Sequence, residues 1–332
     1  MQRMKHRLNS CRNFVSELAR LFRSGEKLRP GICRKTPRRS NGPSKRAIGQ
    51  FEKMFGVPPL ASAKPPAQPG SGGRVNAVLQ TKRQSTTGWQ TALIFSPHPD
   101  DECIVGGLAL RLLREAGWNV VNVAVTLGRK RERRAQRLRE LKNACGFLGF
   151  DLIPLGLEKI NPTTRRKNRG RWLTAVGRIK DILEANRPRV IFFPHERDGH
   201  STHVGAHFLV LDALKKMPRG FECFVVETEF WGQMTDPNLL VESGVEDTGD
   251  LVAALACHIG EMRRNPYHTR LPAWMLDNVR RAELMAGQGG AAPDFTFGTI
   301  YRLRKWSHGR LTNALRSGKL LSCSENAVKL FR

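Results

Sequence analysis

The sequence predicts an α/β fold in which helices cover both faces of a mostly parallel sheet. Short runs of apolar and β-branched residues alternate with longer stretches whose apolar residues recur at helical spacing. Such alternation is typical of parallel sheets with a helix between successive strands. The chain of 332 residues, 40% of them hydrophobic, is also long enough to bury a sizeable core. We therefore expect a Rossmann-like architecture.

The predicted elements alternate from residue 91 onward. Strands are expected near 91–96, 119–126, 151–155, 189–194 and 222–229, and helices near 103–116, 131–147, 172–186 and 202–216. Residues 251–262 predict one further helix and residues 295–303 a further strand. Between these two, the proline-containing stretch 265–272 predicts an irregular lid or wall.

The first 88 residues differ from the rest in composition. They contain 19 Lys and Arg but only 3 Glu, which is a net charge of +16 out of the +27 of the whole chain. Residues 61–73 are rich in Pro, Gly, Ala and Ser and have too little apolar surface to fold. We expect a basic, largely disordered tail and linker over 1–88, a folded domain over 89–310 and a C-terminal tail over 311–332.

The basic tail contains one short amphipathic pattern, whose apolar residues share a helical face among arginines: Phe14, Val15, Leu18, Leu21 and Phe22. Peripheral contact with an anionic membrane, a targeting segment, and an unstructured or overcalled start with Met54 as a later candidate are all compatible with it. The sequence contains no run of eighteen apolar residues and no secretory h-region, and its seven cysteines lack paired spacing. We expect a cytoplasmic protein without a transmembrane span.

A cluster of charged residues follows the first predicted strand. His98 is followed, after a proline, by three consecutive acids: Asp100, Asp101 and Glu102. Such a cluster is costly unless a cation lies beside it. His98 and Asp101 stand three residues apart at the mouth of the predicted helix, a spacing that can aim an imidazole nitrogen and a carboxylate oxygen at one point. Asp100 would then lie beside a bound metal as a spare base.

A second polar segment follows the predicted strand 189–194. Four of the nine histidines fall in residues 195–207, and His200 and His203 have i, i+3 spacing at the start of a predicted helix. The two strand ends thus offer two histidines and a carboxylate, which with an open fourth position is the ligand set of a catalytic zinc. His207 also shares a face with His203, and we expect it to pack or to support a ligand. The alternative is that these side chains only cap helices.

These two segments resemble the (A/P)HPDDE and HxxH motifs of the PIG-L/LmbE-like zinc-dependent N-acetylglucosaminyl de-N-acetylases. The resemblance implies an LmbE-like fold. Residues 137–149 are similar to the RxxEL…LG helix of that family, and the likeness covers about 91–229. The resemblance implies one zinc, or another divalent metal such as iron or cobalt. It also implies roles for six residues: His98, Asp101 and His203 as metal ligands, Asp100 as general base, His200 as an electrophilic or acid histidine, and Arg137 as a substrate arginine.

One position departs from the family pattern, since many members carry an acid where this chain has Thr202. An imidazole needs its second nitrogen held by a carboxylate or carbonyl, and Asp198, two residues before His200, is the candidate acid for holding a histidine here. Glu102 is expected to cap the helix or to support a ligand. His258 and His268 are further candidates for substrate contact.

Two basic stretches, 129–134 and 165–171, also follow predicted strands. A solvated surface explains most charge runs, and attraction of an anionic sugar or lipid is the second explanation. Nucleic acid is not expected as a partner, because aromatic residues make up only 7% of the chain and no nucleic-acid fold signature occurs.

Together these features predict a metal-dependent hydrolase that removes an N-acetyl group from an amino sugar or glycoconjugate. Zinc-activated water would attack the amide while Asp100 accepts a proton. Two alternatives remain open: hydrolysis of another amide or an ester, and a non-catalytic metal- or glycan-binding protein whose basic tail docks on a membrane or on nucleic acid. Oligomeric state cannot be read from this pattern.

Overall fold

The fold is built on one nine-stranded mixed sheet. The computed structural model describes residues 12–13, 15–16, 90–286 and 292–332. Strand order is β3-β2-β1-β4-β5-β7-β6-β9, with β8 paired to β7. The strands are β1 (Thr91–Ser96), β2 (Asn119–Ala124), β3 (Asp151–Pro154), β4 (Val190–Pro194), β5 (Cys223–Thr228), β6 (Leu239–Ser243), β7 (Phe297–Ser307), β8 (Arg310–Asn313) and β9 (Lys319–Leu321).

The first five strands form the parallel half, as predicted. In β1, Ala92 pairs with Val120 of β2 on one side and with Val190 of β4 on the other. The chain thus runs outward from β1 through β2 to β3 and then returns to the other side of β1 as β4. This reversal is a topological switch point, and it leaves a crevice outside the carboxyl ends of β1 and β4.

The second half of the sheet is mixed. β7 is antiparallel to both β5 and β6, and β9 is parallel to β6. The segment after residue 310, expected as a tail, belongs to the folded body. Its last element, η3 (Ala327–Phe331), buries Phe331 against the rings of Trp118 and Phe224, at centroid distances of 5.6 and 5.3 Å.

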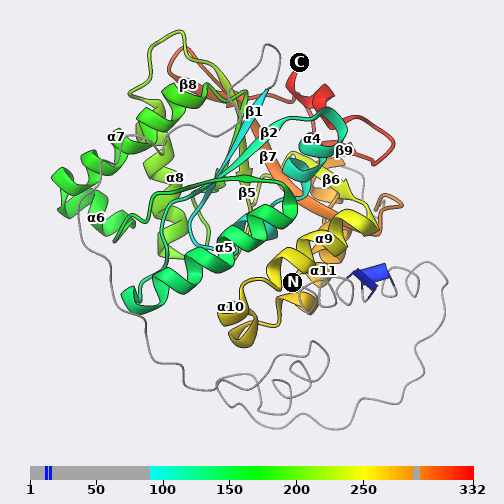
Figure 1. Cartoon of the computed structure of the whole chain (residues 1–332). Coiled ribbons are helices and arrows are strands. Elements are labelled where there is room, and N and C mark those ends of the chain that lie inside the picture. The colour runs from blue at the N-terminus through cyan, green and yellow to red at the C-terminus, as the bar shows by residue number, and fades with distance from the viewer. Residues whose placement is uncertain (1–11, 14, 17–89, 287–291) are drawn as a thin grey trace, which may run out of the picture.

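Helices cover both faces of the sheet, which confirms the predicted fold class. Successive strand residues alternate between two apolar layers: Ile94 packs in a layer with α4, α5, α9 and α11, whereas Leu93 and Phe95 pack in a layer with α7 and α8. In Figure 1, α6, α7 and α8 lie on one side and α4, α9 and α11 on the other. The helices are α3 (Asp101–Ile104), α4 (Gly107–Ala116), η2 (Arg131–Arg133), α5 (Arg134–Leu148), α6 (Pro162–Lys167), α7 (Arg169–Asn186), α8 (Ser201–Leu214), α9 (Val245–Leu255), α10 (Ile259–Arg264), α11 (Tyr267–Arg280) and α12 (Glu283–Ala286).

Two helices expected to be continuous are divided. The one expected over 103–116 is interrupted at Gly106, where a Cβ atom would lie 2.6 Å from the carbonyl oxygen of Glu102 and 2.9 Å from Leu251. Close packing of α9 on this junction therefore requires glycine and a break. The helix expected over 251–262 likewise ends at Leu255 and resumes as α10, so that His258 lies at a corner.

The expected irregular backbone at 265–272 is wrong, because these residues lead directly into α11. Pro266 precedes the first helical turn, where its missing N–H costs nothing. Pro272 lies inside the helix and removes one backbone hydrogen bond. Burial of Leu271 and Met275 in the core offsets that loss.

The described residues of the basic tail are helical, and they pack on the body. Val15 is fully buried in the core, and Arg12 forms an ion pair with Asp250 of α9 and lies over the ring of Phe147. At these residues the predicted amphipathic helix therefore contacts protein. The rest of the predicted tail, including the linker 61–73, lies outside the described residues. Within the described ranges, no helix has the length and apolarity needed to cross a bilayer.

Candidate active site

Three side chains converge where the ends of β1 and β4 meet at the switch point. His98 follows β1, Asp101 begins α3, and His203 lies in the first turn of α8. Nδ1 of His98 lies 3.2 Å from Nε2 of His203, and each of these nitrogens lies 3.4 Å from Oδ2 of Asp101. Residues about a hundred positions apart in sequence thus bring three donor atoms into one small triangle.

The size of this triangle fits a tetrahedral metal ion. Ligand distances of about 2.0–2.1 Å place neighbouring tetrahedral ligands about 3.3 Å apart, and the three observed separations lie within 0.1 Å of this value. The donor set, two imidazoles and one carboxylate, is that of a catalytic zinc. Although burial acts to raise the pKa of Asp101, the neighbouring His203 and His98 lower it below its usual range, which keeps the carboxylate ionised.

His200 offers an alternative donor, since its ring nitrogen lies within 4.8 Å of those of His98 and His203. Its Nδ1 accepts the backbone N–H of Thr202 at 3.2 Å, and its side chain is exposed. Asp101 is the better third ligand, because it is closer and because its Oδ2 also accepts the backbone N–H of His98 at 2.8 Å. Burial, followed by the proximity of His98 and His203, lowers the pKa of His200.

Asp198, the candidate acid for holding a histidine, lies beside the ring of His203 and not beside the ring of His200. Its Oδ1 is 3.4 Å from Nδ1 of His203 and accepts the backbone N–H of His200 at 3.1 Å. Although burial opposes protonation, Asp101 and Asp198 together raise the pKa of His203. Which ring faces the carboxylate is set by the chain turn at 195–200 and could not be predicted from sequence spacing.

Asp100 is buried beside the triangle in a strained backbone conformation. Its φ is 117°, in the left-handed region that residues other than glycine rarely adopt. Burial, then the charges of Asp101 and Glu261, raise the pKa of Asp100 well above its ordinary range, while Arg137 opposes this shift. Strain of this kind clusters at functional sites.

Arg137, the expected substrate arginine, is largely engaged within the protein. Its Nη2 donates to the carbonyl oxygen of Pro99 at 2.9 Å and lies 3.8 Å from Asp100 Oδ1, and its Nη1 lies 3.0 Å from Oε1 of Glu261. Glu261 was missed at the sequence level, although its i, i+3 spacing from His258 was a signal.

His258 does not contact the cleft. It is 1% exposed, and its Nε2 donates to Oε1 of Glu102 at 2.7 Å. Oε2 of Glu102, which was expected to cap the helix or to support a ligand, accepts the backbone N–H of Asp100 at 3.0 Å and so supports the turn before α3. His268 is also absent from the residues that line the cleft.

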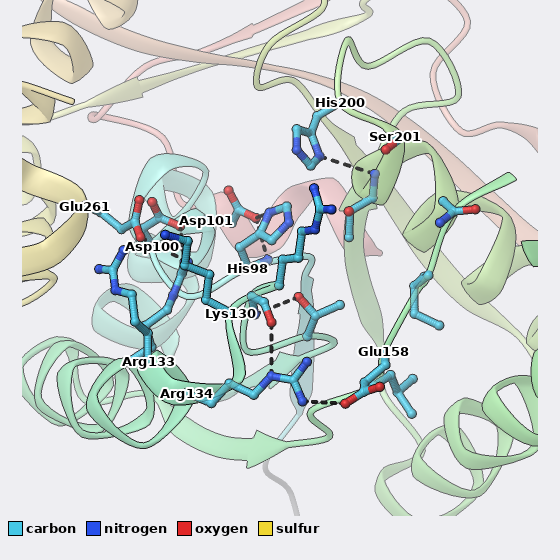
Figure 2. A pocket seen from close by; sticks show the side chains of 18 of the residues that line it. His98, Asp100, Asp101, Lys130, Arg133, Arg134, Glu158, His200, Ser201 and Glu261 are labelled. Carbon is cyan, nitrogen blue, oxygen red and sulfur yellow. Dashed lines mark hydrogen bonds and ion pairs between the residues drawn. The ribbon is translucent and has the colours of Figure 1, made fainter. Parts of the chain in front are cut away.

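A cleft of about 880 Å³ opens over the three donor atoms. Figure 2 shows His98, Asp100 and Asp101 in its middle, with His200 and Ser201 to one side and Lys130, Arg133 and Arg134 along another. Eight lysine and arginine side chains line it: Arg129, Lys130, Arg131, Arg133, Arg134, Arg137, Lys159 and Arg264. Only four carboxylates do so: Asp100, Asp101, Glu158 and Glu261.

Two of the lining acids are already neutralised by arginines. Glu158 pairs with Arg131 and Arg134, and Glu261 with Arg137 and Arg264. Four lining cations pair with no carboxylate among the described residues: Arg129, Lys130, Arg133 and Lys159. The basic stretch 129–134 therefore faces the cleft, one of the two positions the sequence left open for it.

Aromatic side chains form another part of the cleft wall. Tyr267 belongs to the segment that was expected to form a lid or wall, whereas Trp231 was missed at the sequence level. Tyr267 lies at the start of α11, and Trp231 follows β5. Trp231 is 46% exposed, although Asp198 Oδ2 accepts its backbone N–H at 3.2 Å and its ring packs edge-on against Trp274. The loop that presents Trp231 is thus tied to the carboxylate that faces His203.

Two other clusters of potential ligands do not suit a metal. The first group comprises Glu102, Cys103 and His258. Its carboxylate already accepts a hydrogen bond from His258, and burial raises the pKa of the Cys103 thiol well above its usual range. The second group comprises Glu196, His207 and Glu227. Arg302 donates to both of its carboxylates at 2.5 Å and so occupies the position that a cation would take. Nδ1 of His207 donates to the carbonyl oxygen of Pro194 at 2.9 Å, which fits its expected packing role.

Comparison with known proteins agrees with the motifs. Residues 93–214 match the PIG-L family, described as GlcNAc-PI de-N-acetylase. A probable N-acetyl-alpha-D-glucosaminyl L-malate deacetylase 2 from Bacillus cereus is 30% identical over 140 residues, which cover 38% of this chain and 62% of that protein. The match therefore spans less than two thirds of the relative.

Solved structures with a similar course of the chain have low sequence identity. The N,N'-diacetylchitobiose deacetylase from Pyrococcus horikoshii is 17% identical, with a TM-score of 0.49, over 64% of this chain and 83% of that one. The 4-carboxy-2-hydroxymuconate hydratase GalB from Pseudomonas putida is 18% identical, with a TM-score of 0.49, over 64% and 95%. The match to the PIG-L family over residues 93–214 contains both predicted motifs, which agrees with the resemblance seen in the sequence.

Proposed function

We propose that the protein is a metal-dependent de-N-acetylase that hydrolyses the acetamide of an N-acetylated amino sugar carrying an anionic group. The observation that carries this proposal is the triangle of His98, Asp101 and His203 with the buried Asp100 beside it. A site that only binds metal has no need of a second carboxylate, on a strained backbone, next to its ligands.

The three converging side chains would hold one divalent ion, zinc by the chemistry of the donors. When bound, such an ion lowers the pKa of water and polarises an acyl oxygen. The buried Asp198 supports this assignment, because a carboxylate behind a ligating imidazole fixes the tautomer and orientation of the ring.

Asp100 would act as general base. Its raised pKa gives it more affinity for a proton than an ordinary aspartate, so it can accept one from the attacking water. The same carboxyl group can then return that proton to the departing amine. Hydrolysis forms a C–O bond, breaks the C–N bond and releases acetate and the free amine.

His200 would face the acyl oxygen from the other side of the cleft. Its ring is T-shaped to that of His98 at 4.9 Å, and its Nδ1 accepts from Thr202, which leaves Nε2 as the donor. A neutral imidazole that donates one hydrogen bond stabilises developing negative charge on oxygen. The lowered pKa of His200 is compatible with this neutral form.

The lining charges favour an anionic substrate. Four cations without carboxylate partners in the described part of the chain surround one side of the cleft, and a charged cleft raises the local concentration of counter-charged ligands. The names of the matched family and of the Bacillus cereus relative refer to acetylglucosamine joined to phosphatidylinositol and to malate, both of which carry anionic groups. Trp231, which is 46% exposed, offers a flat apolar face to the sugar ring.

The test is acetate release from N-acetylglucosamine conjugates by wild type, Asp100→Asn and His203→Ala, with metal content measured in each. Asp100→Asn should retain metal and lose at least about 100-fold in kcat, the usual range for a general base. His203→Ala should lose both metal and activity. Equal turnover by Asp100→Asn and wild type, at equal metal content, would contradict the assigned base. If metal-loaded wild type releases no acetate from either neutral or anionic conjugates, a non-catalytic metal- or glycan-binding protein is favoured.

A further inference from the structure

We infer that the start of α10 positions Asp100 by clamping the peptide group between Pro99 and Asp100 at both ends. One arm is Arg137, which joins the Pro99 carbonyl to Glu261. The other is Glu102, which joins the Asp100 N–H to His258. His258 and Glu102 are thereby assigned as positioning residues. This inference rests on the proposed role of Asp100 as general base.

The clamp acts on both polar atoms of a single peptide plane. The Pro99 oxygen accepts Nη2 of Arg137 at 2.9 Å, and the Asp100 nitrogen donates to Oε2 of Glu102 at 3.0 Å. Fixing both ends of a peptide plane fixes its rotation, and this rotation sets φ of Asp100. The left-handed φ of 117° is strained for a residue other than glycine and persists only where the surroundings hold it.

Both arms are anchored on one short segment. His258 is the residue before α10 and Glu261 lies in its first turn, so i, i+3 spacing places them on the same side of the helix. His258 Nε2 donates to Glu102 at 2.7 Å, and Glu261 Oε1 lies 3.0 Å from Arg137. A displacement of α10 would therefore move both anchors of the clamp together.

Burial shows that the His258 arm has no competing role at the surface. Glu102 and His258 are 0% and 1% exposed, and neither lines the cleft. A buried carboxylate left without its donor is strongly destabilised. The pair of Glu102 and His258 therefore contributes either to stability alone or also to the geometry of Asp100. These two explanations predict different effects of a substitution on turnover.

The same α10–α11 segment reaches the cleft. Arg264, Asn265 and Tyr267 follow Glu261 within six residues and line the cleft beside Asp100. The position of the α10–α11 segment consequently affects both this wall of the cleft and the orientation of Asp100. This arrangement explains why a corner between two helices carries a buried histidine.

The experiment compares His258→Phe with His258→Gln in the full-length, metal-loaded protein. Phe keeps the ring but removes the donor, whereas the amide of Gln can replace Nε2 as a donor to Glu102. For His258→Phe we expect kcat to fall roughly 10- to 100-fold, because a displacement of about 1 Å in a reacting group can cost 100-fold. KM and metal content should stay as in wild type, and His258→Gln should recover most of the loss.

A second readout does not depend on turnover. Amide hydrogen exchange of the segment around Asp100, followed by mass spectrometry, should be faster in His258→Phe than in wild type or His258→Gln. Glu102→Leu, which is similar in size but accepts no hydrogen bond, should give the same acceleration and replaces His258→Phe if that variant does not fold. Tyr301→Phe is the matched control. It removes a buried hydroxyl that donates to Val105 and accepts from Leu108, but it touches neither arm.

The outcomes separate the positioning role from the proposed function. Unchanged kcat and unchanged exchange in a folded, metal-loaded His258→Phe would overturn the clamp. A fall in kcat no greater than that of Tyr301→Phe at equal loss of stability would also overturn it. Faster exchange at Asp100 in a protein whose wild type deacetylates no conjugate would support the clamp and reject the function.

Discussion

Asp198 lies 3.4 Å from Nδ1 of His203, on the opposite edge of the ring from the nitrogen that faces Asp101. The imidazole is thus held between two carboxylates, and its orientation is set from behind. The other oxygen of Asp198 accepts the backbone N–H groups of Phe230 and Trp231, each at 3.2 Å. One buried side chain therefore aligns a proposed metal ligand and the adjoining wall of the cleft.

Replacing Asp198 by Asn should weaken metal binding while preserving the fold. The amide oxygen can still accept from the backbone of residues 230 and 231, but the negative charge behind His203 is removed. Loss of such a partner typically lowers metal affinity about 10- to 100-fold. Competition with a chelator measures this change. Asp181→Asn on the exposed side of α7 is the control, and equal affinities in the two variants would show that Asp198 does not act on the metal.

Trp231 should contribute to substrate affinity through its exposed ring. Trp231→Ala should raise KM for neutral and anionic conjugates alike by about 5-fold, the effect of losing roughly 1 kcal/mol of aromatic contact. Neither kcat nor metal content should change much, because the backbone contacts of Trp231 to Asp198 remain. Leu173→Ala, at the similarly exposed Leu173 on α7, provides the comparison. An unchanged KM in Trp231→Ala would show that this ring does not contact the substrate.

The sequence predicted some residues of the site but not others. The donor residues could be predicted because His98 and His203 follow buried parallel strands, and strand ends of one sheet meet at one edge. Glu261 and Trp231 lie beyond the motif-bearing region, on elements whose approach to the cleft depends on how α10 and the segment after β5 pack. Side-chain orientation was also beyond reach, as the pairing of Asp198 with His203 shows.

The same distinction applies to the fold. Strands β1 to β5 were predicted closely, because buried parallel strands are continuous apolar runs. The break at Gly106 and the helix through Pro272 were not, since both depend on tertiary packing against α9 and β7. Local pattern fixes which residues are buried, whereas the packing partner decides where a helix bends or continues.

Removing two unpaired cations from the cleft should discriminate between anionic and neutral substrates. The double variant Lys130→Gln/Lys159→Gln should raise KM about 5- to 10-fold for N-acetylglucosamine 1-phosphate and leave it unchanged for the methyl glycoside. Added salt should reduce this difference, since exposed charges are screened beyond about 8 Å at physiological ionic strength. Lys216→Gln, which lies outside the cleft, is the charge control. Equal effects on both substrates would argue against an anionic group in the substrate.

Glu196 should make stability depend on pH in the acidic range. Although partial burial acts to raise its pKa, the hydrogen bond and charge of Arg302 hold it at about 2, below the ordinary value of 4.5. A carboxyl group with a lowered pKa stabilises the folded state above pH 4.5, and this contribution is lost as the pH falls from 4.5 towards 2. Because the side chain of Glu196 is 36% exposed and therefore screened, we expect a contribution on the order of 1 kcal/mol.

Urea unfolding of metal-free wild type and Glu196→Gln should show wild type more stable at pH 7, with the difference shrinking below pH 4.5. A difference that stays constant from pH 7 to pH 3 would show that the ion pair with Arg302 does not supply this stability.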